Sequence, residues 1–308
     1  NRNRLIGMKV DTFLVGASKS GTSSLSNILA SHPDVCMCQI KEPNYFSDDL
    51  PQDVFSESHA KNLDEYHELW DDCHDDCAVF CEASVGYFYS RMASENIKRY
   101  NPNAKILVML RHPVGRLVSA HSFRLNSGNE DVELPVEAYK LDSLRMRGKS
   151  LPKGCSNFRP YREMMDYATQ IERFLNCFPR NQIHIVLMED LIEKRDETVK
   201  KMWGFLGIRD VEIEVLPHEN RSVSARSRFV LSLMSPNSFL VRRFYVPLRK
   251  FRMIKWLGQT IRRMNLKEAR NVLLEEEEVR FLENDFREMV DRTEKLTGVE
   301  LKSRWEGF

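Results

Sequence analysis

A Gly- and Ser-rich segment near the start of the chain has the residue types of a phosphate-binding loop. Residues 16–23 read GASKSGTS and lie between the apolar run Val10–Val15 and a helical stretch. A turn between a strand and a helix directs unpaired backbone N–H groups and the positive end of the helix dipole at one point. Lys19 supplies a charge, and hydrogen bonds can come from the hydroxyls of Ser20, Thr22 and Ser23. The segment predicts an anion site, although a plain turn with a surface lysine has the same composition.

The order of residues in this loop differs from that of nucleotide hydrolases and kinases. Their G-x-x-x-x-G-K-[ST] pattern places a lysine after the second glycine, next to a hydroxyl that binds magnesium. In this chain Thr22 follows Gly21, and Lys19 precedes that glycine by two positions. A strand-end aspartate for magnesium is also missing. A nucleotide-dependent kinase is therefore the less favoured enzyme class.

Residues 19–25, KSGTSSL, resemble the K-[ST]-G-T-[ST]-x-L loop of sulfotransferases that use 3′-phosphoadenosine 5′-phosphosulfate, PAPS. In that family the loop binds the 5′-phosphosulfate, the sheet is P-loop-like, and magnesium is not required. The resemblance implies that PAPS and its product PAP are bound, without a metal, by Ser18, Lys19, Ser20, Gly21, Thr22 and Ser23.

The same family predicts a second site, for the 3′-phosphate, at the end of a buried strand. There an arginine begins an R-x-P turn, and a serine follows eight residues later. The apolar run Ile106–Leu110 is followed by Arg111, then Pro113, with Ser119 at the expected spacing. A guanidinium can contact a phosphate with two hydrogen bonds, and a hydroxyl can complete the shell. Arg111 alone would be a surface charge, but two matching motifs favour the family.

A third motif, KEPNYF at residues 41–46, resembles the K-E-P-x-[FY]-F segment of heparan-sulfate-type and related bacterial sulfotransferases. In those enzymes the glutamate is the general base toward the acceptor. The resemblance implies this role for Glu42, with Lys41 neutralising the sulfuryl oxygens or orienting Glu42. Lys19 would stabilise charge on the bridging oxygen. The alternative for Glu42 is a surface acid beside Lys41.

Two weaker matches add candidate residues. Residues 82–89 lie where heparan-type enzymes carry an E-K-[ST]-P-x-Y segment lining the acceptor cleft, but alanine and valine replace its lysine and proline. Tyr87 and Tyr89 are candidate acceptor contacts or ordinary strand aromatics. Residues 220–226 resemble the N-x-S-x-x-x-R segment that closes over the nucleotide in bacterial members, which makes Arg226 a candidate nucleotide ligand.

Strand-like apolar runs alternate with helical segments along the chain, which predicts an α/β fold with an open, mostly parallel sheet and helices on both faces. The expected strands are Val10–Val15, Val35–Ile40, Ala78–Ala83, Ile106–Leu110 and Ile183–Leu187. The expected helices are Ser23–Ser31, Asn62–Trp70, Met92–Tyr100, Arg116–Leu125, Tyr167–Phe178, Thr198–Leu206 and Glu275–Leu296. We expect a single sulfotransferase domain over residues 1–308, with a nucleotide-binding core at 10–216 and a C-terminal basic segment and helices at 217–308.

Composition excludes several classes of protein. The 308 residues are 42% apolar and 30% charged, unlike a disordered or collagen-like chain. No apolar stretch approaches the roughly 18–20 residues of a membrane span. The net charge is +1, yet residues 48–82 hold twelve acids and one base, while residues 220–267 hold twelve bases and no acid. The basic stretch is either a solvated face or a positively charged surface that attracts anions to a site. No nucleic-acid partner is expected.

The cysteines are few for a secreted scaffold and odd in number. They are Cys36, Cys38, Cys73, Cys77, Cys81, Cys155 and Cys177. The run around Cys73 and Cys77 lacks the paired C-x-x-C spacing of common zinc sites. We expect reduced or structural cysteines, no metal, and a cytoplasmic protein. The Golgi lumen is the alternative if an N-terminal anchor has been removed.

The motifs together predict transfer of a sulfuryl group from PAPS to an acceptor hydroxyl or amine. The glutamate base favours a carbohydrate or another polar small molecule over a flat phenol. A catalytically silent family member that binds PAPS or a polyanion is the alternative from a different functional class. Neither the acceptor nor the oligomeric state can be identified from these patterns.

Overall fold

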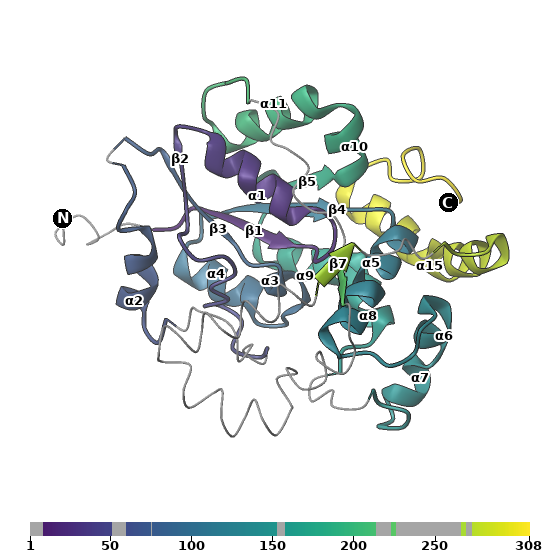
Figure 1. Cartoon of the computed structure of the whole chain (residues 1–308). Coiled ribbons are helices and arrows are strands. Elements are labelled where there is room, and N and C mark those ends of the chain that lie inside the picture. The colour runs from purple at the N-terminus through teal and green to yellow at the C-terminus, as the bar shows by residue number, and fades with distance from the viewer. Residues whose placement is uncertain are drawn as a thin grey trace.

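A five-stranded parallel sheet lies at the centre of the protein, in the strand order β2-β3-β1-β4-β5 (Figure 1). The computed structural model describes residues 9–50, 60–74, 76–152, 158–213, 223–225, 266–268 and 273–308. The strands are β1 (Thr12–Gly16), β2 (Val35–Met37), β3 (Val79–Ala83), β4 (Lys105–Leu110) and β5 (Ile183–Leu187). Because all five run parallel, their carboxyl ends meet at one edge, where open α/β sheets bind ligands.

Helices cover both faces of the sheet, and alternate residues of β4 show why. Ile106, Val108 and Leu110 pack into one core cluster, whereas Leu107 and Met109 pack into another. Successive side chains of a strand point to opposite faces, so a continuous apolar run requires cover on both. One face is covered by α1 (Thr22–Ser31), α10 (Met188–Glu193) and α11 (Arg195–Leu206) (Figure 1). The other is covered by α3 (Gly86–Tyr89), α4 (Ala93–Tyr100), α9 (Tyr167–Cys177) and α15 (Glu276–Thr297).

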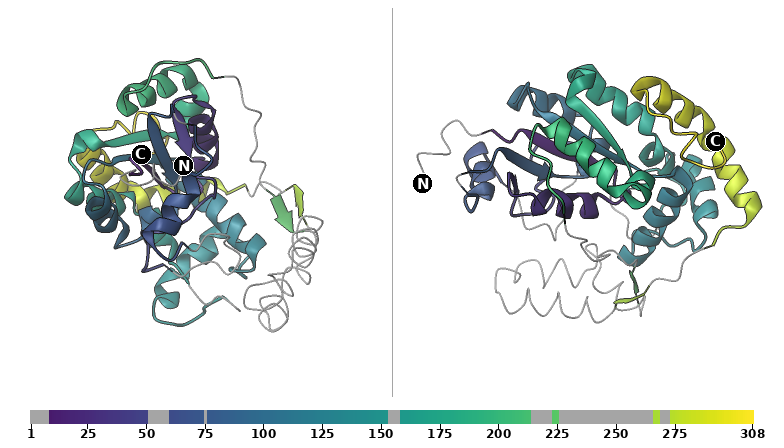
Figure 2. Two further views of the ribbon diagram at one scale, coloured as in Figure 1. Left: turned by 90° about the vertical axis from the view of Figure 1, so that its left-hand side faces the viewer. Right: turned by 90° about the horizontal axis from the view of Figure 1, so that it is seen from above.

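The remaining elements lie around this core. They are α2 (Leu63–His67), η2 (Glu68–Trp70), α5 (Pro113–Ser127), α6 (Pro135–Lys140), α7 (Asp142–Arg145), α8 (Tyr161–Met165) and η3 (Arg180–Gln182). Two short strands, β6 (Val223–Ala225) and β7 (Leu266–Glu268), pair antiparallel outside the main sheet, and β6 contacts α5 (Figure 2). Among the described helices, none combines the length and the apolar character needed to cross a membrane.

The predicted α/β architecture is confirmed, and the differences are local. The five expected strands and the seven expected helices all form, with shifted ends. Tyr87 and Tyr89, for which a place in a strand was one of two interpretations, instead lie in the helical turn α3. The helices α6, α7, α8 and α10 were not predicted. All have six residues or fewer, which is too short for a helical period to stand out.

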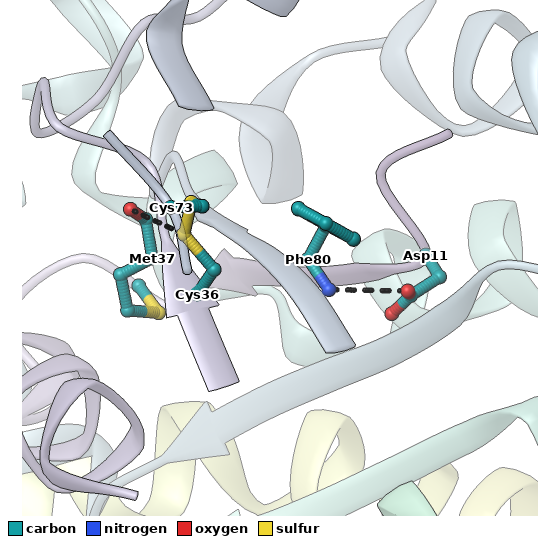
Figure 3. Close-up of a disulfide and its surroundings, with 5 residues drawn as sticks. All are labelled: Asp11, Cys36, Met37, Cys73 and Phe80. Atoms are coloured by element: carbon teal, nitrogen blue, oxygen red, sulfur yellow. Dashed lines mark hydrogen bonds between the residues drawn. A yellow bond between two sulfur atoms is a disulfide. The ribbon is translucent and has the colours of Figure 1, made fainter. Parts of the chain in front are cut away.

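Two of the cysteines, which were expected to be reduced or structural, are paired. Cys36 of β2 and Cys73, which follows η2, form a disulfide with a Cα–Cα distance of 5.8 Å (Figure 3). Nearby, a carboxylate oxygen of Asp11 accepts the backbone N–H of Phe80 at 3.1 Å, beside the start of β1. Disulfides are rare in reducing compartments, so this pairing weighs against the reducing compartment expected from the sequence. Cys38, Cys77, Cys81 and Cys177 are free.

Candidate active site

The predicted phosphate loop connects β1 to α1 at the carboxyl edge of the sheet. The backbone N–H of Ala17 donates to the carbonyl of Met109 on β4 at 2.8 Å, which anchors the start of the loop. Gly21 precedes α1 with φ 92°, and a Cβ there would lie 2.9 Å from the Met109 side chain. The positive φ favours glycine, and a Cβ would in addition push the end of the Met109 side chain aside. No side chain caps α1. The N–H groups of Ser24 and Leu25 donate to the Gly21 carbonyl, so those of Thr22 and Ser23, at the start of the helix, are the ones placed to bind an anion.

Three cationic side chains converge on this loop. Burial lowers the pKa of Lys19, and the nearby charges of Arg111 and Lys41 lower it further, while Glu42 opposes them. Lys41 donates from Nζ to the Ser23 hydroxyl at 2.6 Å. A lysine whose pKa is depressed by two other cations is electrostatically unfavourable until an anion arrives. The donor set therefore fits a phosphate or sulfate group, and the structure brings the first and third motifs together.

The segment that carries Glu42 lies against the end of β3. The backbone N–H of Glu42 donates to the Ala83 carbonyl at 3.2 Å. Glu42 and Asn44 have left-handed backbones with φ 58° and 53°. Such values are uncommon for residues other than glycine and cluster at functional sites. The half-buried Glu42 side chain lies within electrostatic reach of Lys19.

The second predicted phosphate contact begins where β4 ends. The Arg111 guanidinium packs over Gly115 in the first turn of α5, where a Cβ would lie 3.3 Å from Arg111 Nε. Ser119 is half-buried one turn further along the helix. Residues four apart share a helix face, so Gly115 and Ser119 lie on one side of α5, and the Arg111 guanidinium lies over the start of that side. Gly115 was not predicted, and its role becomes visible only from this packing.

Arg116 is a further residue that the sequence motifs did not identify. Its buried guanidinium donates from Nε to the Ser18 carbonyl at 2.9 Å and from Nη1 to the Met164 carbonyl at 2.6 Å. It also lies 4.8 Å from the centre of the Tyr167 ring, and the Tyr167 hydroxyl donates to the Arg111 carbonyl at 2.7 Å. Burial lowers the pKa of Arg116. These contacts join the phosphate loop to the Arg111 turn.

The C-terminal tail holds the same turn from the other side. The two carboxylate oxygens of Glu189 accept the backbone N–H of His112 at 2.9 Å and the indole N–H of Trp305 at 3.1 Å. The His112 ring lies 2.9 Å, through Nε2, from the Glu306 carbonyl. Sequence reasoning could not link residues this far apart in the chain.

The remaining candidates lie elsewhere. Tyr87 is buried, and its hydroxyl accepts the backbone N–H of Phe46 at 3.2 Å, so it supports the Glu42 segment and does not line an open cleft. Tyr89 is half-buried and donates to Glu163 at 2.8 Å. Arg226 lies outside the described residues. An unpredicted aromatic, Phe123, is 57% exposed, and its ring centre is 4.8 Å from the Lys19 ammonium.

The chain resembles known proteins in both sequence and fold. The family model of the sulfotransferase domain matches residues 9–228. Heparan sulfate glucosamine 3-O-sulfotransferase 5 of Mus musculus is 27% identical over 197 residues, which are 63% of this chain and 52% of that protein. The bifunctional heparan sulfate N-deacetylase/N-sulfotransferase 1 of Mus musculus is 28% identical over 200 residues, 62% of this chain and 21% of that protein. The match to the first of these spans about half of its length.

A solved structure extends the likeness of fold over almost the whole chain. A sulfotransferase from Alicyclobacillus acidocaldarius superimposes with a TM-score of 0.66 and 23% sequence identity. The match covers 96% of this chain and 98% of that one. The shared fold places the three motifs in a framework that is already known from an experimental structure.

Proposed function

Because the chain belongs to the sulfotransferase family by the match of its domain model to residues 9–228, we propose that it transfers a sulfuryl group from PAPS to a hydroxyl group of a carbohydrate. The observation that carries this proposal is the convergence of Lys19, Lys41 and Arg111 on the start of α1, with Glu42 as their neighbouring acid. The cations can neutralise the negative charge of the phosphosulfate, and the carboxylate of Glu42 can accept a proton from an acceptor.

The phosphate loop and the Arg111 turn bind different phosphate groups of the nucleotide. In this proposal residues 18–23 contact the 5′-phosphosulfate with amides and hydroxyls, and Lys19 adds charge. Arg111, which precedes α5, and Ser119 within α5 contact the 3′-phosphate. Arg116 fixes the position of the loop relative to the Arg111 turn, because it donates a hydrogen bond to the Ser18 carbonyl and lies against Tyr167. Arg226 stays a proposed nucleotide contact on sequence grounds.

PAPS supplies the sulfuryl group, and the chain supplies proton transfer and charge stabilisation. Glu42, as a carboxylate, takes the proton from the attacking hydroxyl. Lys19 and the loop amides stabilise the negative charge that builds on the bridging oxygen as PAP leaves. Lys41, which bonds Ser23, neutralises the sulfuryl oxygens. The lysines and amides can provide the charge that a metal provides in phosphoryl transfer, because a sulfuryl group carries less negative charge than a phosphoryl group.

A carbohydrate acceptor is supported by the relatives named for heparan sulfate. The direct test is to incubate the protein with labelled PAPS and a panel of glycans, sterols, phenols and alkaloids. Label in a glycan would support the proposal. Label in a phenol alone would contradict the proposed acceptor, and PAPS binding without transfer to any acceptor would favour a silent binding protein.

Binding of PAP provides a test that does not need the acceptor. We expect PAP to raise the melting temperature without added magnesium, because the described donors are cations, amides and hydroxyls. A ligand at a hundredfold excess over its Kd stabilises a protein by about 2.7 kcal/mol, which a thermal scan detects. Adenosine is the control, since it lacks both phosphates. A shift that appears only with magnesium would contradict the proposed mode of binding.

Substitutions of Arg111 and Ser119 should separate the 3′-phosphate contact from the 5′-phosphosulfate contact. Arg111→Ala should weaken PAP by about tenfold or more, because a charged hydrogen bond contributes roughly 1.5–3 kcal/mol. Ser119→Ala should weaken it less. Adenosine 5′-phosphosulfate lacks the 3′-phosphate, so its affinity should change little in both variants. Calorimetry with the two ligands measures this difference, and equal losses for both would show that these residues do not bind the 3′-phosphate.

A further inference from the structure

A buried carboxylate lies at the end of β3, beneath the segment that carries Glu42. Glu82 is fully buried, and its oxygens accept hydrogen bonds from the hydroxyls of Tyr66 and Ser84, the latter at 2.5 Å. The Tyr87 hydroxyl also bonds it. Buried carboxylates usually pair with a cation, but the partners of Glu82 are three neutral hydroxyls. They come from α2, from the residue that follows β3, and from α3.

Two of these hydroxyls also hold the backbone of the Glu42 segment. The N–H of Asn44 donates to the Ser84 hydroxyl at 3.0 Å, and the N–H of Phe46 donates to the Tyr87 hydroxyl at 3.2 Å. The N–H of Glu42 donates to the Ala83 carbonyl. Every second residue of the segment is therefore attached to the end of β3 or to α3. The Asn44 side chain adds a bond from Nδ2 to the Glu42 carbonyl at 2.8 Å.

The charge on Glu82 sets the direction of these bonds. An ionised carboxylate only accepts hydrogen bonds, so Ser84 and Tyr87 must point their protons at it. Their oxygen lone pairs then face the N–H groups of Asn44 and Phe46. A hydroxyl that is free to rotate could instead turn its proton toward these N–H groups and repel them. Glu82 thus converts two hydroxyls into fixed acceptors for the segment.

The segment needs this support because its backbone is unfavourable by itself. Glu42 and Asn44 both have left-handed φ values. Asparagine tolerates this conformation better than most residues, but for Glu42 it costs free energy that the surroundings must offset. Without the two fixed acceptors, the segment would relax and carry the Glu42 carboxylate away from its place beside Lys19.

We propose that Glu82 is a positioning residue for the transfer reaction: it orients Ser84 and Tyr87 so that they hold the backbone around Glu42. This inference rests on the proposed role of Glu42 as general base. Glu82 does not touch the acceptor or the nucleotide and acts only through the segment above it.

The environment of Glu82 makes the arrangement sensitive to pH. Burial raises the pKa of Glu82 to about 7, against the lowering effect of bonds from Ser84, Tyr66 and Tyr87. Burial first, and then the charge of Glu82, raises the pKa values of the surrounding thiols and phenols, so these stay protonated at neutral pH: Cys38, Tyr66, Cys81, Tyr87 and Tyr100. His67, whose ring lies beside Tyr66, has a pKa lowered by burial. Below pH 7 Glu82 gains a proton and can donate a hydrogen bond. The hydroxyls of Ser84 and Tyr87 then no longer have to donate to it, so their hydrogen-bond directions are no longer fixed.

The test compares Glu82→Gln with the wild type in steady-state transfer from pH 5.5 to 8.5. Glutamine keeps the size but presents an N–H₂ donor to one of the hydroxyls. We expect kcat to fall by about tenfold to a hundredfold, the usual cost of a misplaced catalytic group. PAP affinity should stay within twofold, and the rise in kcat of the wild type between pH 6 and 8 should flatten.

Two more variants distinguish positioning from general loss of stability. Ser84→Ala removes the acceptor of the Asn44 N–H but keeps Glu82, so kcat should fall while the pH dependence remains. This variant also tests the positioning role if Glu82→Gln does not fold. Tyr139→Phe is the matched control, because it removes a buried tyrosine hydroxyl that donates to another carboxylate, Asp285, at α15. It should lower the melting temperature and leave kcat and its pH profile unchanged.

The outcomes separate this inference from the proposed function. Wild-type kcat and pH profile in Glu82→Gln would overturn the positioning role even if the enzyme transfers sulfuryl groups and depends on Glu42. A loss of PAP binding in Glu82→Gln would overturn it as well, because the nucleotide site would then depend on this carboxylate. Absence of transfer by the wild type with every acceptor would instead contradict the proposed function.

Discussion

Glu42→Gln should lower the rate of sulfuryl transfer by about 10²–10⁴, the usual contribution of a positioned general base. Glutamine has the size of glutamate but cannot take a proton. Since the base faces the acceptor, PAPS affinity should stay within about twofold. Single-turnover rates with a saturating acceptor, together with calorimetric titration of PAP, measure the two effects separately.

If this prediction fails, the structure indicates which other residues could be the general base. If Glu42→Gln turned over at the normal rate, a histidine near the Arg111 turn would be the next base to consider. His121 is fully buried, with Nε2 3.0 Å from the Val132 carbonyl, and the His112 ring contacts the C-terminal tail. A backbone carbonyl therefore faces Nε2 of each ring, and burial separates His121 from solvent. Loss of PAPS binding in Glu42→Gln would place Lys41 and Glu42 in the donor site.

Lys19→Ala should impair both nucleotide binding and turnover. Loss of one preorganised donor to a developing negative charge costs about 10²–10³ in kcat, and loss of one charged hydrogen bond weakens PAP by about tenfold. The matched control is Lys98→Ala. Lys98 also lies over an aromatic ring, with Nζ 5.0 Å from the centre of Phe178, but on α4. It should change neither quantity, and a Lys19→Ala variant with normal kcat would exclude Lys19 from charge stabilisation.

The pKa of Lys19 adds a pH dependence of known sign to this prediction. Burial, Arg111 and Lys41 all lower that pKa, so the free protein loses the Lys19 charge at a lower pH than an ordinary lysine would. PAP affinity should therefore decline on the alkaline side earlier than for an exposed lysine. Binding of the anion favours the protonated lysine, so the protein should take up protons when PAP binds at high pH. Calorimetry in buffers of different ionisation enthalpy detects this uptake.

The sequence was most informative where chemistry depends on short spacings. The loop around Lys19, the segment of Glu42 and the turn of Arg111 are each contiguous, and each directly follows an expected strand. Continuous apolar runs such as Ile106–Leu110 predicted a sheet buried on both faces, because only two covered faces satisfy such a run. These local patterns were sufficient for the fold class and the family.

Contacts between distant segments could be seen only in three dimensions. Arg116 bonds Ser18, and Glu189 joins His112 to Trp305. The sequence left Tyr87 either as an acceptor contact or as a strand aromatic, but α3 turns it inward to support Phe46. Which side of a short helix is buried depends on the elements that pack against it, and the sequence of four residues does not contain that information.

The residue types at the site, their order along the chain and the strands that precede them follow from the sequence alone, because they depend on local propensity and on short-range spacing. The charge environment of Lys19, the hydroxyls around Glu82 and the left-handed backbone at Glu42 were decided by the tertiary structure. Burial and the directions of hydrogen bonds arise from several segments at once. Only the folded chain brings those segments within the few ångströms over which desolvation and hydrogen bonding act.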